Sequence, residues 1–274
     1  MVTRTTPAKE LIYGIAPVPI DPDDMPDRIP IELIQAPTIE QLPFFLNIYL
    51  EGLGEDVAAL LMLSNIPIRY DPLNRRLFVA PDIYIAFDVD VAAIREKTSY
   101  NVWEVGKPPE FALEVASPST YQRDLYEKPE IYERIGVGEY WMFDPTGGNL
   151  YGQSLTGFRL VAGIYEPIDI VPNEHGLESG YSEVLRLRLC SLERSRHSEL
   201  AAVQPNLEIR DDHNPVQMLV QDPKTGEYLL NDRGLLARTR QAEARAERAE
   251  EQTEQAGAEV ERLRERLRQL EQSE

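Results

Sequence analysis

The chain has 274 residues, 42% of them hydrophobic, which suits one globular domain with extensions or two small domains. Its formal net charge of −19 argues against tight non-specific binding to nucleic acid, because such binders carry a basic footprint. A single cysteine, Cys190, excludes an intrachain disulfide, and no run approaches the ~18 apolar residues of a membrane span. We therefore expect a soluble, cytoplasmic protein that does not enter the membrane.

The N-terminal part of the chain changes character twice. Residues 1–30 are rich in proline and aspartate, which predicts an extended lead-in and not a core element. From Thr38 the apolar spacing becomes helical, and Gly52 and Gly54 interrupt it. Of the two helical segments, residues 55–64 have the clearer helical pattern, and we predict a helix there.

Four strands are predicted next. Residues 66–69 and 77–80 read as short strands on either side of a turn that contains Pro72. Residues 83–87 are apolar, and so are residues 110–116 apart from Glu110 and Glu114, which is typical of strands buried on both faces. Helices that alternate with strands around one sheet favour a mixed α/β domain.

A helix is predicted to follow the second apolar strand. Ser119 with Gln122 three residues later forms a capping-box pattern, and the helix is expected to run to Ile135 with Gly136 at its C-terminal cap. Pro129 falls inside this helix and is expected to kink it, because proline removes one backbone hydrogen bond.

The remaining strands are predicted from short apolar or alternating runs. They cover residues 139–143, 150–154, 158–161 and 185–190, and a turn leads into a further strand within residues 222–230. Cys190 ends a strand in which leucine and arginine alternate, so we interpret it as a small structural residue.

Two acids and a lysine stand where they could meet at one point. Asp82 opens the first apolar strand, Glu114 lies inside the second, and Lys128 follows one helix length later. A carboxylate buried among apolar residues is unfavourable unless a cation or hydrogen-bond donors compensate it. Two carboxylates at neighbouring strand ends would form a site for a hard divalent ion, and a lysine beside them could handle a phosphate or a proton.

The residues around these three are weaker candidates. Asp124, Lys128 and Tyr132 are four residues apart and share a helix face, so Asp124 could form a salt bridge along the helix or orient a partner, and we favour a structural role. Glu55 could supply a third acid, although we do not favour it. Three aromatic residues are interpreted as packing residues and not base-stacking ones: Tyr132, Tyr140 and Trp141. Three histidines without ligand spacing are given no role: His175, His197 and His213.

Several motifs occur in order along the chain. They are Pro81-Asp82, the run from Glu114 through Val115, Ala116, Ser117, Pro118 and Ser119 to Thr120, then Asp124, Lys128 and Tyr132, and finally residues 136–141 with Asp144-Pro145. The series resembles the bacterial family known as putative restriction endonucleases, a branch of the PD-(D/E)XK nuclease superfamily, over roughly residues 30–190. The resemblance implies a restriction-endonuclease-like mixed β-sheet flanked by helices. It also implies that Lys128 replaces the usual superfamily lysine, whose position Ala116 occupies here.

The resemblance implies a Mg²⁺-dependent endonuclease that cleaves phosphodiester bonds in nucleic acid, with DNA favoured. Asp82, Glu114 and the backbone carbonyl of Val115 would hold Mg²⁺, for which Mn²⁺ could substitute, and Lys128 would orient the attacking water or offset charge in the transition state. One alternative is a catalytically inactive, nuclease-like interaction module acting through a coiled coil, which the net charge, Ala116 and Pro129 favour. An enzyme that acts on a small nucleotide is a further alternative.

The C-terminal segment has a different pattern. Its apolar or small residues are spaced alternately four and three positions apart: Leu235, Thr239, Ala242, Ala246, Ala249, Thr253, Ala256, Val260, Leu263, Leu267 and Leu270. This heptad seam predicts a coiled coil over residues 235–274 and therefore a homodimer. The alternative is a single solvated helix held by Glu–Arg pairs. The expected organisation is thus a lead-in (1–30), a nuclease-like domain (31–192), a connecting segment with a short strand hairpin (193–234) and the coiled coil.

Overall fold

The computed structural model describes residues 31–52, 61–64, 66–97, 99–205, 207, 214–230 and 232–271. The predicted lead-in, Glu55 and His213 lie outside the described residues. The chain divides into two compact units, the first comprising Met1–Gln204 with Ile209–Leu229 and the second Pro205–Glu208 with Leu230–Glu274.

The first unit is built on a six-stranded mixed sheet with the order β1-β4-β6-β7-β8-β9. Its strands are β1 (Leu61–Leu63), β4 (Ile83–Ala86), β6 (Phe111–Val115), β7 (Glu139–Phe143), β8 (Leu155–Val161) and β9 (Ile164–Pro167). Strands β6 and β7 are parallel, and the other neighbouring pairs are antiparallel. Every residue of β4, β6 and β7 is buried, as their apolar sequences predict.

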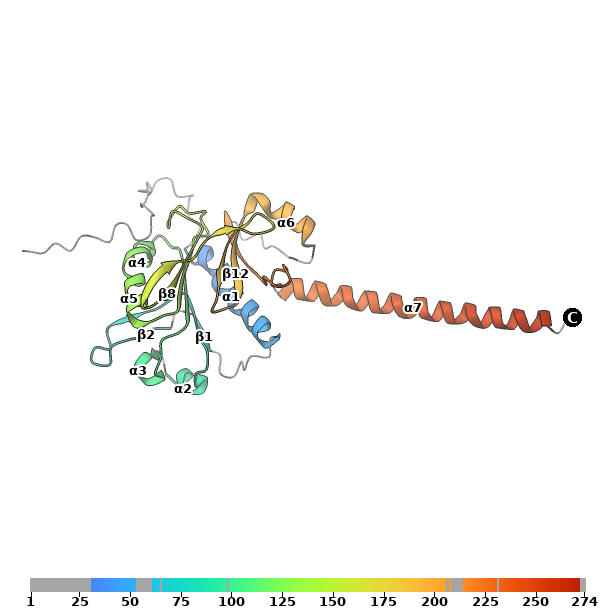
Figure 1. Ribbon diagram of the computed structural model, residues 1–274, viewed down its shortest axis with the longest axis horizontal. Helices are drawn as coiled ribbons and strands as arrows, with labels where there is room; N and C mark the ends of the chain where they lie inside the picture. The colour runs from blue at the N-terminus through green and yellow to red at the C-terminus, as the bar shows by residue number, and fades with distance from the viewer. Residues whose placement is uncertain are drawn as a thin grey trace, which may run out of the picture. The chain divides into compact units, whose positions relative to one another are not determined.

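Hydrophobic cores cover both faces of this sheet. On one face, Leu46 of α1 (Ile31–Gly52) packs in a cluster with Ile83 and Leu113. On the other face, Tyr84 and Ala112 pack in a cluster with residues of α4 (Tyr121–Tyr126) and α5 (Lys128–Ile135). Figure 1 shows α1 on one side of the sheet and α4 and α5 on the other. Because strand side chains alternate between faces, the even-numbered residues of β4 and β6 point toward α4 and α5.

Two smaller sheets complete the first unit. One has the order β10-β11-β12-β13, with β10 at Val171–Pro172, β11 at Glu178–Ser182, β12 at Leu187–Glu193 and β13 at Val216–Gln221. The other has the order β3-β2-β5, with β2 at Ile68–Arg69, β3 at Phe78–Val79 and β5 at Tyr100–Asn101. The short helices are α2 (Val91–Arg95), α3 (Val102–Val105), the 3₁₀ helix η3 (Arg194–Arg196) and α6 (His197–Val203).

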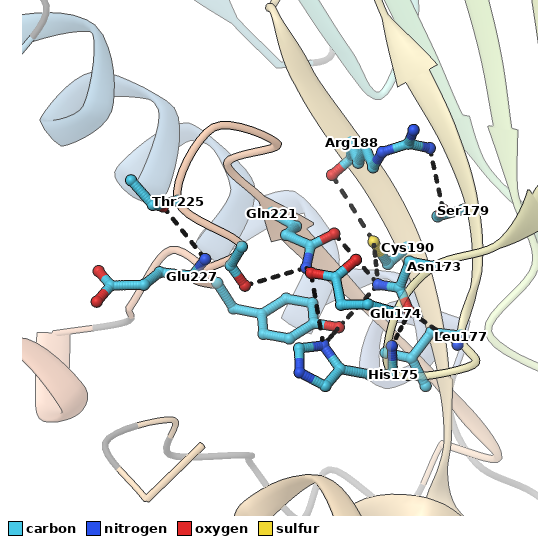
Figure 2. Close-up of polar contacts among 12 residues, drawn as sticks. Asn173, Glu174, His175, Leu177, Ser179, Arg188, Cys190, Gln221, Thr225 and Glu227 are labelled. Atoms are coloured by element: carbon cyan, nitrogen blue, oxygen red, sulfur yellow. Dashed lines mark hydrogen bonds and ion pairs between the residues drawn. The ribbon is translucent and has the colours of Figure 1, made fainter. Parts of the chain in front are cut away.

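A polar cluster fixes one end of the four-stranded sheet (Figure 2). The amide of Asn173 donates to Gln221 Oε1 at 3.2 Å and to Tyr228 Oη at 2.9 Å, so it joins the β10–β11 loop to the segment after β13. His175 Nδ1 lies 3.0 Å from the same Tyr228 hydroxyl. Cys190 is buried in β12, as predicted, and burial raises the pKa of its thiol to about 12. The thiol therefore stays protonated near neutral pH and is a packing group.

Two elements differ from the sequence-based expectation. The helix predicted over residues 55–64 is wrong where the structure describes it, because Leu61–Leu63 pairs with β4 as an antiparallel strand. The strand predicted over residues 150–154 is also wrong. There the backbone N–H groups of Leu150 and Tyr151 donate to the carboxylate of Asp144 at 2.7 and 2.9 Å, and not to a neighbouring strand.

The helix predicted after β6 is two helices. α4 ends at Tyr126, and α5 begins at Lys128 with Pro129 in its first turn, where a missing N–H costs no helical bond. The predicted kink is therefore a break. Thr120 occupies the N-cap of α4 without a capping hydrogen bond from its side chain, so the predicted Ser119 cap is wrong, whereas Gly136 ends α5 with φ 91° as expected.

The second unit consists mainly of α7 (Asp232–Glu271), a helix of 40 residues. Ion pairs three residues apart support it, such as Arg264 with Glu261 at 2.8 Å. Two residues of the predicted seam, Val260 and Leu263, are 47% and 51% exposed. Among the described helices, none is both long and apolar enough to cross a bilayer.

Candidate functional site

Strand register brings the two predicted acids together. β4 and β6 pair antiparallel with Ile83 opposite Leu113, and one step further along the same register Asp82 stands opposite Glu114. Both are even-numbered, so both point to the face covered by α4 and α5. The backbone N–H of Val115 donates to Asp82 Oδ2 at 2.7 Å, which holds that carboxylate at the end of β6.

Lys128 reaches the same point from the first residue of α5. Its Nζ lies 2.7 Å from Glu114 Oε2 and 2.7 Å from Asp124 Oδ1 of α4. The lysine side chain is only 8% exposed, in contrast to an ordinary surface lysine. The structure thus brings Asp82, Glu114 and Lys128 together, and Asp124 forms a salt bridge with Lys128 across the break between α4 and α5.

Buried tyrosines hold the acids from the opposite side. Tyr132 Oη donates to Glu114 Oε1 at 2.7 Å, and Tyr151 Oη donates to Asp124 Oδ2 at 2.8 Å. Tyr132 is therefore more than the packing residue that we expected. Tyr151 was missed altogether, because it lies in a turn outside the ordered motifs and has no local signal.

Charge in this cluster of side chains is unbalanced. If all three acids were ionised, their negative charge would exceed that of the single ammonium by two. Burial raises the pKa of Asp82 to about 6, although the N–H of Val115 and the charge of Lys128 oppose the shift. Burial also raises the pKa of Glu114 well above its usual range, and the nearby charges of Asp124 and Asp82 add to this effect.

Lys128 stays cationic in this environment. Burial by itself would lower the pKa of Lys128, but the carboxylates of Glu114 and Asp124 outweigh it and the pKa is raised. An ammonium has three N–H donors, and these two carboxylates take up two of them. The third donor is the one that could reach a phosphate oxygen or a water molecule.

The donor set fits a hard divalent ion. Asp82 Oδ1 has no hydrogen bond to the described residues. The carboxylate of Glu114 lies beside it, and a cation would offset the repulsion between the two groups when both are ionised. The described residues hold no group of three or more Asp, Glu, His or Cys side chains that could hold a metal ion. Two carboxylates and a carbonyl remain, and oxygen groups of this kind are the ligands that hard divalent ions take.

Gln35 is a further residue that the sequence did not reveal. It lies on α1 and donates from Nε2 to the carbonyl oxygen of Val115 at 2.5 Å. A carbonyl oxygen has two lone pairs, so this contact orients the Val115 carbonyl and leaves one lone pair for another partner. A lone glutamine in a helix carries no signal of such a contact.

The sheet is mixed, and the paired ends of β4 and β6 present two acids to a buried lysine on a helix. This arrangement is that of a restriction-endonuclease-like α/β protein. The model of the family described as "Uma2: Putative restriction endonuclease" matches residues 39–189, and the chain belongs to this family. The match confirms the resemblance inferred from the ordered motifs.

Comparison with solved structures gives a distant similarity. The chain is similar to a crystal structure described as a putative nuclease belonging to DUF820 from Anabaena variabilis, with 14% sequence identity and a TM-score of 0.34. The similarity covers 54% of this chain and 74% of that one. None of the curated proteins compared with the chain matches it.

Proposed function

We propose that the protein is a Mg²⁺-dependent endonuclease that cleaves phosphodiester bonds in nucleic acid, with DNA as the favoured substrate. The observation that carries the proposal is the contact between Lys128 Nζ and Glu114 Oε2, beside Asp82, at the paired ends of β4 and β6. Membership of the family described as "Putative restriction endonuclease" supports the nuclease class.

Each residue of the site has a proposed task. Asp82, Glu114 and the carbonyl of Val115 would hold Mg²⁺, which when bound supplies Lewis-acid polarisation of the phosphate and an acidified water. Glu114 must give up its proton to serve as a ligand, because metal ligands bind deprotonated. Lys128 would use its third N–H to orient the attacking water or to offset charge on the phosphate in the transition state.

The alternative is an inactive, nuclease-like module. Ala116, at the usual position of the superfamily lysine, is fully buried in the hydrophobic core and offers no charge. The burial of Lys128 against Glu114 favours the active form. Burying a charged side chain is unfavourable, so a lysine without a role in the site would be expected to stay at the surface. An enzyme acting on a small nucleotide would use the same groups, and substrate choice separates it from a nuclease.

A cleavage assay tests the proposal. Full-length protein with Mg²⁺ or Mn²⁺ is incubated with supercoiled, linear and single-stranded DNA and with RNA, and we expect DNA to be cut. Lys128→Ala should lower turnover at least ~10²-fold, the usual scale for a positioned charge or proton-transfer group, while Mn²⁺ affinity changes little. Lys107→Ala is a matched control, because that lysine forms only a partly exposed pair with Glu110. No cleavage of any polymer by the wild type would contradict the proposal.

The proposed assembly is a homodimer through residues 235–274. The exposed Val260 and Leu263 support it, because a heptad seam stays in contact with a partner when helices supercoil. Two sites in one dimer would suit cleavage of two strands. We also retain a cytoplasmic location, which the single buried thiol supports.

A further inference from the structure

The hairpin formed by residues 66–80 differs in charge from the rest of the chain. It contains Arg69, Arg75 and Arg76 but only one acid, Asp71, so its net charge is +2 in a chain of −19. Residues 72–78, around its tip, are all exposed, and Leu73 is 97% exposed. An exposed basic segment on an acidic protein gives a polyanion a local place to bind.

The base of this hairpin contacts the helix that carries Lys128. The guanidinium of Arg134, on α5, lies 5.5 Å from the ring centre of Tyr70. Arg134 is six residues after Lys128, a rise of about 9 Å along a helix. The outgoing strand β3 leads through Pro81 directly to Asp82. The hairpin is thus connected to the candidate site in two ways. Its Tyr70 contacts α5, which carries Lys128, and its second strand leads to Asp82.

Contacts within the hairpin orient its tip. The guanidinium of Arg69 lies over the ring of Phe78 at 5.9 Å and donates to the carbonyl oxygen of Arg75. The carboxylate of Asp71 accepts the N–H groups of Leu73 and Asn74, which closes the turn. These contacts leave the guanidinium groups of Arg75 and Arg76 at the exposed tip.

The guanidinium groups of Arg75 and Arg76 form no ion pair or hydrogen bond with a described residue. The positive charge of Arg75 helps to lower the pKa of Glu104. The Glu104 carboxylate itself accepts hydrogen bonds from Lys97 at 2.7 Å and from Asn101 at 2.7 Å. The two arginines are therefore available to an external anion.

We propose that the hairpin of residues 66–80 is a nucleic-acid arm in which Arg75 and Arg76 contact backbone phosphates beside the scissile bond. Arginine suits this task because its planar fork matches phosphate oxygens. The exposed Leu73 and Phe78 would lie against sugars or bases. This inference rests on the proposed nuclease function and adds how an acidic protein holds a polyanion.

The chain length limits the reach of the arm. Asp82 is six positions after Arg76, and an extended chain spans at most about 3.6 Å per residue, so their Cα atoms are at most about 22 Å apart. Duplex DNA rises about 3.4 Å per base pair, so this backbone span corresponds to about six base pairs, to which the arginine side chains add their own length. Such contacts position the substrate without reading its sequence.

Binding measured without cleavage tests the arm. Fluorescence anisotropy of labelled duplexes with full-length protein is recorded with Ca²⁺ in place of Mg²⁺, at salt concentrations from about 50 to 200 mM, the range over which phosphate contacts change affinity most visibly. We expect Arg75→Gln/Arg76→Gln to weaken binding equally for unrelated sequences and to reduce the slope of log K against log[salt] by about 2. Arg245→Gln/Arg248→Gln, on the exposed surface of α7, removes the same charge and should leave the slope unchanged.

Three outcomes would be decisive. An unchanged affinity and slope in the hairpin variant would overturn the arm, and so would an equal loss in the α7 control, because general charge would then explain it. Selective loss in the hairpin variant supports the arm even if the wild type fails to cut DNA, so failure of the proposed catalysis is distinguishable. Unaltered thermal melting of the hairpin variant shows that folding is not the cause.

Discussion

Asp82 combines partial burial with a free carboxylate oxygen, and this combination makes its ionisation sensitive to pH. Its pKa is raised to about 6 by burial, whereas in an unfolded chain the carboxyl group titrates near 3.8. A raised folded-state pKa means that the proton favours the folded protein. The stability contributed by the protonated carboxyl is fully present below about pH 4 and is lost as the pH rises through about 6.

This sign leads to a measurable pH dependence. The metal-free protein should lose stability between about pH 4 and pH 6 from Asp82, and Glu114 should extend the loss to higher pH. In Asp82→Asn, the part of this stability loss that occurs between about pH 4 and pH 6 should disappear. Mn²⁺ should restore stability of the wild type at high pH, because it binds the deprotonated acids. Thermal melting against pH, with and without Mn²⁺, measures both effects, and identical curves for wild type and variant would contradict the assignment.

A substitution at Tyr132 tests whether its hydroxyl affects the ionisation of Glu114 or whether the residue only packs in the core. In Tyr132→Phe the bond to Glu114 is lost, which should cost about 1–3 kcal/mol of stability and make Glu114 harder to ionise. Mn²⁺ binding should then require a higher pH than in the wild type.

Tyr165→Phe is the matched control for this prediction. Tyr165 is also buried, and its hydroxyl donates to the carbonyl oxygen of Val137 at 2.9 Å, away from the acids. We expect a comparable loss of stability and an unchanged pH profile of Mn²⁺ binding, measured by calorimetry. If both variants shift the profile equally, Tyr132 has only a structural role.

At the scale of elements, the break between α4 and α5 delivers Lys128 to the acids. A continuous helix would need an N–H at Pro129, which proline lacks, so the chain restarts its helix one residue earlier. Lys128 is the first residue of the new helix, and Asp124 in α4 still reaches it at 2.7 Å. The proline that weakened the sequence-based case for Lys128 is therefore part of what positions it.

The sheet supporting β6 depends on a close contact between glycine and tryptophan. Gly157 of β8 stands opposite Trp141 of β7, and a Cβ atom at Gly157 would lie 2.7 Å from the indole ring. Gly157→Ala should therefore cost about 1–3 kcal/mol, the usual range for overpacking a dense core. Gly257→Ala on α7 is the control: its Cβ would meet nothing within 4 Å, and alanine should stabilise that helix by up to about 1 kcal/mol. Denaturant unfolding measures both, and a neutral Gly157→Ala would show that the indole ring can move aside.

At the scale of the whole molecule, the exposed seam of α7 should determine the oligomeric state. We expect full-length protein to sediment as a dimer and a chain truncated after Gly234 to remain folded as a monomer. Leu263→Lys should weaken the dimer, because a charge enters the seam, whereas Ala258→Lys adds the same charge off the seam and should not. If the truncated chain is also a dimer, the interface lies outside the coiled coil, and if full-length protein is monomeric, α7 is a solvated helix.

Local sequence was sufficient for much of the site. The apolar runs beside Asp82 and Glu114 show that β4 and β6 are buried, which marks both acids as unusual. The register of β4 against β6 is what turns the two acids to one face. The heptad spacing over residues 235–274 likewise predicts a helix, which the structure places at Asp232–Glu271, since periodicity is a property of neighbouring residues. These features depend on short-range geometry, which a single sequence records directly.

Only the tertiary structure decided which distant groups complete the site. Gln35 and Tyr151 come from a helix and a turn that lack motif signals, yet they bind the carbonyl of Val115 and the carboxylate of Asp124. Leu61–Leu63 has helical spacing but forms β1, because pairing with β4 satisfies its backbone and buries it against the sheet. Such contacts follow from how strands and helices pack across long sequence separations, and local propensity is too weak to determine them.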